Sequence, residues 1–226
     1  MKKIAALLIA MLCMISVTAS AEGKLKVVEK NLIVYADDDN GYFYARVENV
    51  GDEAVGVDSG DLVVFSDDDE IILSSAYVTT SPSYVVLQPG DYLYVQDFLW
   101  DSALKGAAIA DYKFSVSARK SDRAFEKVHC EASFELAGTD SFDNYVYVTF
   151  TNTLDKPLYD FYIVAALHDA DGNLIIVDSS SLSNVAVHPG CTVTAKLYVD
   201  RDLMEHYAKN GIVPESVDAM VLHVDE

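Results

Sequence analysis

YFYARVENVGD at residues 42–52 returns as YVYVTFTNTLD at residues 145–155, and the two Asn residues, Asn49 and Asn152, lie 152 minus 49, or 103, positions apart. In both stretches apolar residues alternate with others, which is the period of a β-strand with one face toward a core. Each strand then runs into an Asn and an Asp, which are typical of turns. Later landmarks repeat at nearly the same distance, so the chain is predicted to contain two copies of one module of about domain size.

The first 21 residues read as a signal peptide. Lys2 and Lys3 form a basic start, an apolar stretch covers residues 4–17, and Ala19-Ser20-Ala21 offers small residues for cleavage. A bulky Leu12 before Cys13 argues against lipid attachment. We therefore expect a mature protein that begins after Ala21 and is secreted, extracellular or in the cell envelope. No stretch is long enough to predict a membrane span.

The charge excludes two classes of partner. The formal net charge is -20, from 16 basic and 36 acidic residues, and removal of Lys2 and Lys3 leaves 14 minus 36, or -22. Such a charge repels the phosphates of nucleic acids and anionic membrane surfaces. Nucleic acid is therefore not an expected partner.

Strand patterns fill the rest of the chain, and no long helical period competes with them. In the first half, strands are predicted at 25–35, 42–49, 61–66, 71–78, 91–98 and 111–118. In the second half they are predicted at 125–136, 145–152, 161–168, 174–180, 191–199 and 217–224. The expected fold class is all-β, with one antiparallel β-sandwich at residues 22–120 and its repeat at 121–226.

Two short elements also repeat. Leu87-Gln88-Pro89-Gly90 and Val187-His188-Pro189-Gly190 each predict a turn into a strand. A short corner helix is predicted at 101–106 and another at 202–211, where Asp202 and Glu205 have the spacing of a capping box and Gly211 can end the helix.

The second half resembles a known family. Asn152 followed by Asp155-Lys156-Pro157, the run from Leu167 to Leu174, and the turn at 187–190 resemble the bacterial FxLYD-type domains. Where that family has Phe-x-Leu-Tyr-Asp, this chain has AALHD at 165–169 and VVFSD at 63–67, so the leading Phe and the Tyr are missing from both. The resemblance implies tandem immunoglobulin-like sandwiches on an extracellular protein without a known catalytic site.

One acidic cluster has the alternation of a calcium loop. Asp169, Asp171 and Asn173 can point oxygens at one centre, and calcium takes six to eight such ligands. No Glu closes an EF-hand loop, and Asp-Gly between two apolar runs is also ordinary hairpin chemistry. A hairpin turn and a calcium site thus both remain open, and no other cofactor is predicted.

Cys130 and Cys191 are the cysteines of the predicted mature chain. Both fall in register with apolar neighbours, so both side chains are expected to face the core of the second module. An exported protein permits a disulfide between them, whereas free Cys is itself among the most buried residue types. A disulfide and two separate buried thiols both fit the pattern.

Tyrosines supply the main candidate for binding. By alternation Tyr42, Tyr44, Tyr92 and Tyr94 point away from the core and lie on strands that neighbour each other in a sandwich of this kind, while Tyr145 and Tyr147 repeat the first pair. An exposed aromatic surface can stack on sugar rings or seat another protein. Alternatively, the tyrosines pair across strands, or the other module covers them.

No enzymatic site is predicted. The histidines stand singly, and no Gly-x-Ser-x-Gly setting or phosphate-binding glycine loop is present. The function expected is a secreted, non-catalytic binding or adhesion module of the bacterial envelope, with a protein or a cell-surface glycan as partner. A carbohydrate-binding module and a calcium-stabilised spacer are the alternatives, and the sequence leaves the oligomeric state open.

Overall fold

A computed structural model of the chain describes residues 24–35, 38–139 and 141–224. The predicted signal peptide lies outside this range. The described chain is predominantly β-strand, and its strands pair antiparallel, which confirms the all-β prediction. The strands form four sheets, two from each half of the chain.

The first half forms sheets I and II. Sheet I has the order β1-β2-β6, from β1 (Leu25–Val34), β2 (Asn40–Asn49) and β6 (Tyr92–Trp100). Sheet II centres on β3 (Val55–Ser66), which pairs with β4 (Ile71–Thr79), with the short β5 (Val86–Leu87) and with β7 (Ile109–Arg119).

The second half forms sheets III and IV with a similar order of pairing. Sheet IV has the order β13-β10-β9, from β9 (Cys130–Leu136), β10 (Asn144–Thr151) and β13 (Thr192–Tyr198). Sheet III has the order β12-β11-β14-β8, from β8 (Phe125–Val128), β11 (Phe161–Asp169), β12 (Leu174–Leu182) and β14 (Pro214–Val224). Sheet IV thus repeats sheet I, and the order β12-β11-β14 in sheet III repeats the order β4-β3-β7 in sheet II, whereas β8 and β5 differ between the two sheets.

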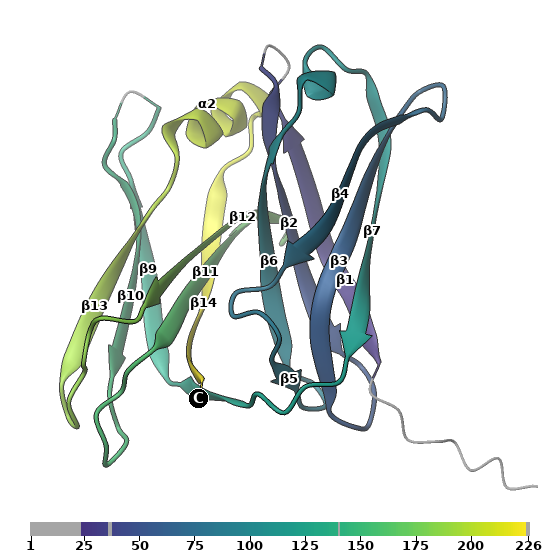
Figure 1. The fold of residues 1–226 in the computed structure, drawn as a ribbon. Coiled ribbons are helices and arrows are strands. Elements are labelled where there is room, and N and C mark those ends of the chain that lie inside the picture. The colour runs from purple at the N-terminus through teal and green to yellow at the C-terminus, as the bar shows by residue number, and fades with distance from the viewer. Residues whose placement is uncertain (1–23, 36–37, 140, 225–226) are drawn as a thin grey trace, which may run out of the picture.

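The four sheets stack as layers in the order IV, III, I, II, from left to right in Figure 1. Between sheets I and II, Phe43, Ala45 and Val47 pack in one hydrophobic core with Leu62 and Val64. A second hydrophobic cluster includes the contacts between sheets III and IV and continues into the first half, where it takes in Tyr44 and Tyr94. The inner layers, sheets I and III, are therefore covered on both faces.

The repeated Asn fixes the same turn in both halves. Asn49 is 0% exposed, and its side-chain amide donates to the carbonyls of Glu53 (2.8 Å) and Leu87 (3.0 Å). Asn152 is 1% exposed and donates to the carbonyls of Lys156 (3.0 Å) and Val187 (2.6 Å).

The backbone at each Asn completes the joint. The carbonyl of Asn49 accepts from Gly90 N, and the carbonyl of Asn152 accepts from Gly190 N, at 2.9 and 2.8 Å. Each Asn thereby ties the end of its strand to the Pro-Gly turn, because a buried amide stabilises a fold only when its hydrogen bonds are made. The repeat thus places the same hydrogen-bonded contact, between an Asn and a Pro-Gly turn, in both halves.

Some predicted boundaries were wrong. The single strand predicted at 125–136 breaks at His129 into β8 in sheet III and β9 in sheet IV, whereas the matching β1 stays in sheet I with an irregularity between Val27 and Glu29. Strand β3 begins at Val55, earlier than the predicted start at residue 61. Gly56 and Gly60, which are typical of strand breaks in a sequence, lie inside the strand. A Cβ on Gly60 would overlap the ring of Phe114, so the glycine serves close packing there.

Both corner helices form, with different boundaries. The first is a 3-10 turn, η1 (Ser102–Leu104), capped by the side chain of Asp101. The second is α2 (Arg201–Asn210), which begins one residue before the prediction, and its N-cap is Asp200 rather than Asp202. Gly211 ends it with φ 69°, in the left-handed conformation that was predicted for a helix terminus.

Candidate functional site

The four tyrosines predicted as an exposed surface do not form one. Tyr44 is 0% exposed and Tyr94 is 1% exposed, while Tyr42 and Tyr92 are half-buried. They do point away from the core of the first half, as alternation predicted. The second half lies on this face, so the interpretation of these four residues as an exposed binding surface is wrong, and the alternative, that the other module covers them, is the one the structure has. They build a contact within the chain.

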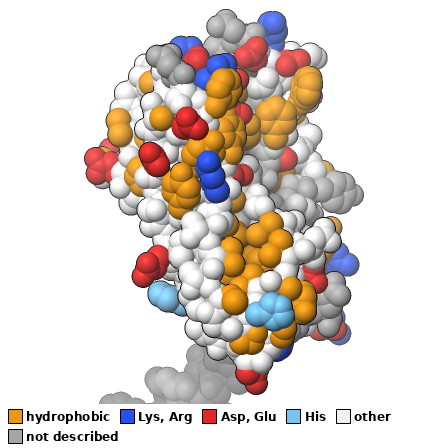
Figure 2. Space-filling model, turned by 90° about the vertical axis from the view of Figure 1, so that its left-hand side faces the viewer, with side chains coloured by type: hydrophobic (Ala, Val, Ile, Leu, Met, Phe, Trp, Pro, Cys, Tyr) orange, Lys and Arg blue, Asp and Glu red, His pale blue; other side chains and the backbone are white. Residues whose placement is uncertain are grey.

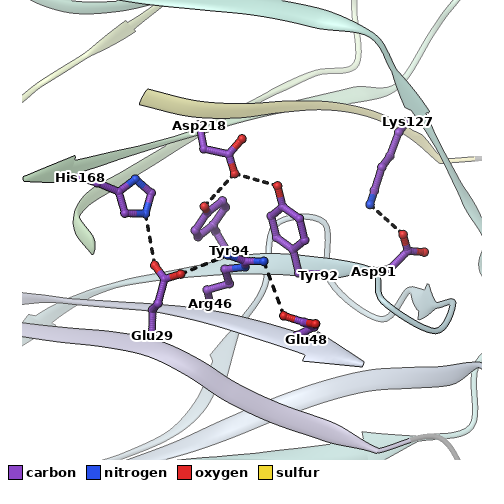
Figure 3. A network of polar contacts seen from close by, with 9 residues as sticks. All are labelled: Glu29, Arg46, Glu48, Asp91, Tyr92, Tyr94, Lys127, His168 and Asp218. Carbon is purple, nitrogen blue, oxygen red and sulfur yellow. Dashed lines mark hydrogen bonds and ion pairs between the residues drawn. The ribbon is translucent and has the colours of Figure 1, made fainter. Parts of the chain in front are cut away.

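Asp218 is the centre of that contact (Figure 3). The hydroxyls of Tyr92 and Tyr94 both donate to Asp218 Oδ2, at 2.7 and 2.9 Å. Burial, with the hydrogen bond to Asp218, raises the pKa of Tyr92 to about 12, and burial raises that of Tyr94 still further, so both stay protonated donors at neutral pH. A hydrogen bond to a charged acceptor contributes about 1.5–3 kcal/mol.

Arg46 and His168 extend the network on either side of Glu29. Arg46 pairs with Glu29 at 3.1 Å and with Glu48 at 3.5 Å, and its guanidinium lies 4.0 Å from the ring centroid of Tyr92. On the facing sheet, His168 Nε2 lies 3.2 Å from Glu29 Oε2. Figure 3 shows that these side chains come from both halves and converge between the layers.

Lys127 closes one end of the network from β8. Its ammonium lies 2.7 Å from Asp91 Oδ1 and 5.2 Å from the ring centroid of Tyr92. Its side chain is 42% exposed, so the pair contributes about 0–1 kcal/mol. The contacts of Asp218, His168 and Lys127 cross the boundary between the halves, whereas the pairs of Arg46 lie within the first half. Its chemistry is that of a joint that holds the two halves in one orientation.

Sheet IV presents the matching face to solvent. Tyr145 and Tyr147 on β10 are half-exposed, and Tyr198 on β13 is 43% exposed. The ring centroids of Tyr145 and Tyr147 lie 6.2 Å apart, and those of Tyr145 and Tyr198 lie 6.1 Å apart. The Lys196 ammonium lies 3.3 Å from the ring centroid of Tyr145.

Figure 2 looks onto this side of the molecule and shows a band of orange side chains running down it, interrupted near its middle by a basic one. Beyond the tyrosines the face turns to threonine. Thr149 and Thr194 share a hydrogen bond of 2.8 Å across the strands, as do Thr151 and Thr192. The sheet IV face, defined as the outward side chains of β9, β10 and β13, therefore combines aromatic rings with hydroxyls.

The Asp169 cluster forms a hairpin turn between β11 and β12. Asp169 Oδ1 accepts from the backbone N of Asp171 (3.0 Å) and of Asn173 (2.8 Å), and the Asn173 side chain donates to both carboxylate oxygens. The Asn173 side chain, with the backbone donors, lowers the pKa of Asp169. Gly172 takes φ 80° in the turn. Calcium at this cluster stays a prediction.

The cysteines are not bonded to each other. Cys130 and Cys191 are both free thiols, so the disulfide alternative is wrong in this structure. Cys130 is half-buried, and its Sγ lies 3.5 Å from the carbonyl of Ala219. Cys191 is exposed rather than in the core, because β13 begins only at Thr192 and Cys191 still belongs to the turn.

Within residues 24–35, 38–139 and 141–224, no group of three or more His, Cys, Asp or Glu side chains is placed to hold a metal ion. In the same part of the chain, no helix has the length and apolar character needed to cross a bilayer.

Comparison with known proteins identifies no family. No family model matches the sequence, and no curated protein matches it. Among solved structures, red sea bream transglutaminase is similar at 13% identity and a TM-score of 0.23, over 88% of this chain and 30% of that chain. The VP2 subviral particle of infectious bursal disease virus is similar at 9% identity and a TM-score of 0.22, over 90% of this chain and 67% of that one. Both scores are too low to support any conclusion about this protein.

Proposed function

We propose that this protein is a secreted, non-catalytic binding or adhesion module of the bacterial cell envelope, built from two immunoglobulin-like sandwiches. The repeated order of strand pairing in the two halves supports the tandem arrangement. The pattern at residues 1–21 supports export. The polar network between the halves binds one half to the other, which suits a rigid two-part scaffold.

One observation carries the proposal. In sheet I, Tyr92 and Tyr94 hold sheet III. The matching face of sheet IV keeps the β2-type tyrosines as Tyr145 and Tyr147, has threonines at the positions of Tyr92 and Tyr94, and leaves its tyrosines partly exposed. The sheet IV face has exposed aromatic rings, and such rings are common where a protein binds a partner. We therefore assign the sheet IV face as the binding surface.

Carbohydrate binding is the second candidate, favoured by the same three tyrosines and the threonine pairs beside them. Tyrosine rings can lie against sugar rings, while the hydroxyls of Thr149 and Thr194 can both donate and accept. The rings of Tyr145 and Tyr198 meet at 62°.

The test is a pull-down of the mature chain, residues 22–226, on envelopes and purified peptidoglycan of the source organism. We expect retention of the wild type and loss of retention in the double variant Tyr145→Ser/Tyr147→Ser. Tyr159→Ser is the matched control, since Tyr159 is 49% exposed and lies outside sheet IV. Equal retention of wild type and double variant would rule out this face, and retention on peptidoglycan alone would favour the carbohydrate alternative.

A further inference from the structure

A small cavity lies where the two halves meet, between sheet I and the strands β12 and β13. Its volume is about 180 Å³, and its polar lining residues are Tyr42, Tyr44, Gln96, Asp178, Tyr198 and Asp200. A water molecule occupies about 30 Å³ of liquid, so the space exceeds the needs of a single bound water. Among the described residues that line it, none is Lys, Arg or His.

Tyr44 brings a hydroxyl without a partner to this cavity. Its side chain is 0% exposed, and its hydroxyl has no hydrogen-bond partner in the described part of the chain. Burial raises the pKa of Tyr44 well above its ordinary value, so the hydroxyl stays neutral and can both donate and accept. Buried hydroxyls are normally satisfied, so this one indicates a place for an external polar group.

Two carboxylates line the same space. Asp200 Oδ2 accepts from the Tyr42 hydroxyl at 3.3 Å, while Asp200 Oδ1 caps α2 by accepting from Asp202 N at 2.7 Å. Burial raises the pKa of Asp178, and hydrogen bonds from Ser179 N and the Gln96 side chain work against that rise. A cation bound in this space would be attracted by both carboxylates.

We propose that this cavity binds the ammonium group of a lysine side chain from a partner protein. A primary ammonium has three N–H donors and no acceptor. Asp178, Asp200 and the Tyr44 hydroxyl supply three acceptors at one cavity. Two carboxylates fall short of the six to eight oxygens that calcium takes, which favours an organic cation over a metal ion.

The rest of the lining suits the stem of a lysine. Leu203 and Val177 provide apolar surface for methylene groups, and Tyr198, which is 43% exposed, also lines the cavity. Tyrosine faces also attract cations. The net charge of -20 draws cationic partners toward the chain from a distance.

The cavity goes beyond the proposed sheet IV surface. Tyr198 borders both, but the groups that would hold the ammonium lie inside the joint between the halves and not on the sheet IV face. A partner that lays its surface on sheet IV can reach the cavity with one lysine. The inference does not depend on the sheet IV proposal, because the cavity is tested with a small molecule that is too small to need that face.

The test uses Nα-acetyl-lysine amide as the probe, with the neutral Nα-acetyl-norleucine amide as its matched control, at constant ionic strength. We expect saturable shifts of the Gln96 side-chain amide resonances with the lysine probe and none with the norleucine probe. Tyr44→Phe should weaken binding of the lysine probe about tenfold, since it removes one hydrogen bond to a charged group.

Tyr44→Phe is a clean variant because the lost hydroxyl has no partner in the described chain, so the fold should persist. Asp178→Asn should weaken binding by at least as much. Tyr147→Ser, on the sheet IV face, should leave binding of the probe unchanged. Equal shifts with norleucine amide, or wild-type affinity in Tyr44→Phe, would overturn the proposal even if the sheet IV face binds envelopes.

Discussion

The outward faces of sheets I and IV come from the two copies of the repeated sequence, but they have different surroundings. Tyr44 in the first half is 0% exposed beneath sheet III, whereas Tyr147 at the matching position of the second half is half-exposed to solvent. The outward direction of a tyrosine follows from strand period alone. What covers it is decided by the neighbouring layer, so one repeat yields an internal joint and the other a free surface.

The largest loss of unfolding free energy should come from removing the buried Asn that both halves share. Asn49→Ala and Asn152→Ala each remove a buried amide. The backbone carbonyls and N–H groups to which that amide is hydrogen-bonded are then left without a partner. We expect each variant to lose about 4 kcal/mol of unfolding free energy, several times a typical surface change. Urea denaturation followed by circular dichroism measures this, and a loss below about 1 kcal/mol in either variant would show that the joint is dispensable.

The next effect separates the covered face from the free one. Asp218→Ala leaves the hydroxyls of Tyr92 and Tyr94 without their acceptor, and we expect a loss of about 2 kcal/mol. Asp143→Ala is the matched change, because Asp143 accepts from the exposed Tyr145 hydroxyl at 3.4 Å. It should cost less than about 0.5 kcal/mol. Equal losses in the two variants would mean that burial of the first face does not matter.

A third comparison uses alkaline pH. The pKa of Tyr92 is raised from 10.0 to about 12 in the folded chain, so between these values the unfolded chain has lost a proton that the folded chain still holds. Stability should therefore be complete below pH 10 and fall as the pH rises toward 12. Urea midpoints measured across this window should fall less steeply for Tyr92→Phe than for the wild type, and identical slopes would contradict the assignment.

The thiols give a contrast within the second half. Cys191 is exposed and should react with a thiol reagent in the native protein, while burial shields Cys130 and raises its pKa. We expect reaction at Cys191 to be faster by about tenfold or more, since the thiolate is the reactive form. Mass spectrometry of timed samples of the mature chain assigns the sites. Equal rates would indicate that β9 opens readily at its first residue.

The smallest effect is expected at the Asp169 turn. Its carboxylate already accepts hydrogen bonds from the turn, so adding EDTA should leave the melting temperature unchanged. A fall in melting temperature that calcium reverses would establish a site there. Asp169→Ala should lower the melting temperature whether or not calcium is present, because it removes the acceptor that shapes the turn.

The sequence predicted what depends on local period and turn chemistry. Strand positions, the Pro-Gly turns and Gly211 follow from patterns within a few residues. The break at His129 could not be predicted, because the apolar alternation continues through it and only pairing with β14 distinguishes β8 from β9. The cover over Tyr44 and the position of Cys191 depend on packing between layers, and a single sequence holds no signal for this.

Asp218 is synthesised well after the tyrosines that it binds. It lies on β14, so the acceptor for Tyr92 and Tyr94 is synthesised 126 and 124 residues after them. Chains emerge N-terminal part first at about 5–20 residues per second, so the first half is complete several seconds before its cover exists. During that interval an aromatic face lies bare on a nascent chain. The hazard for aggregation is therefore greatest in the nascent chain before β14 is made, and it ends when β14 docks.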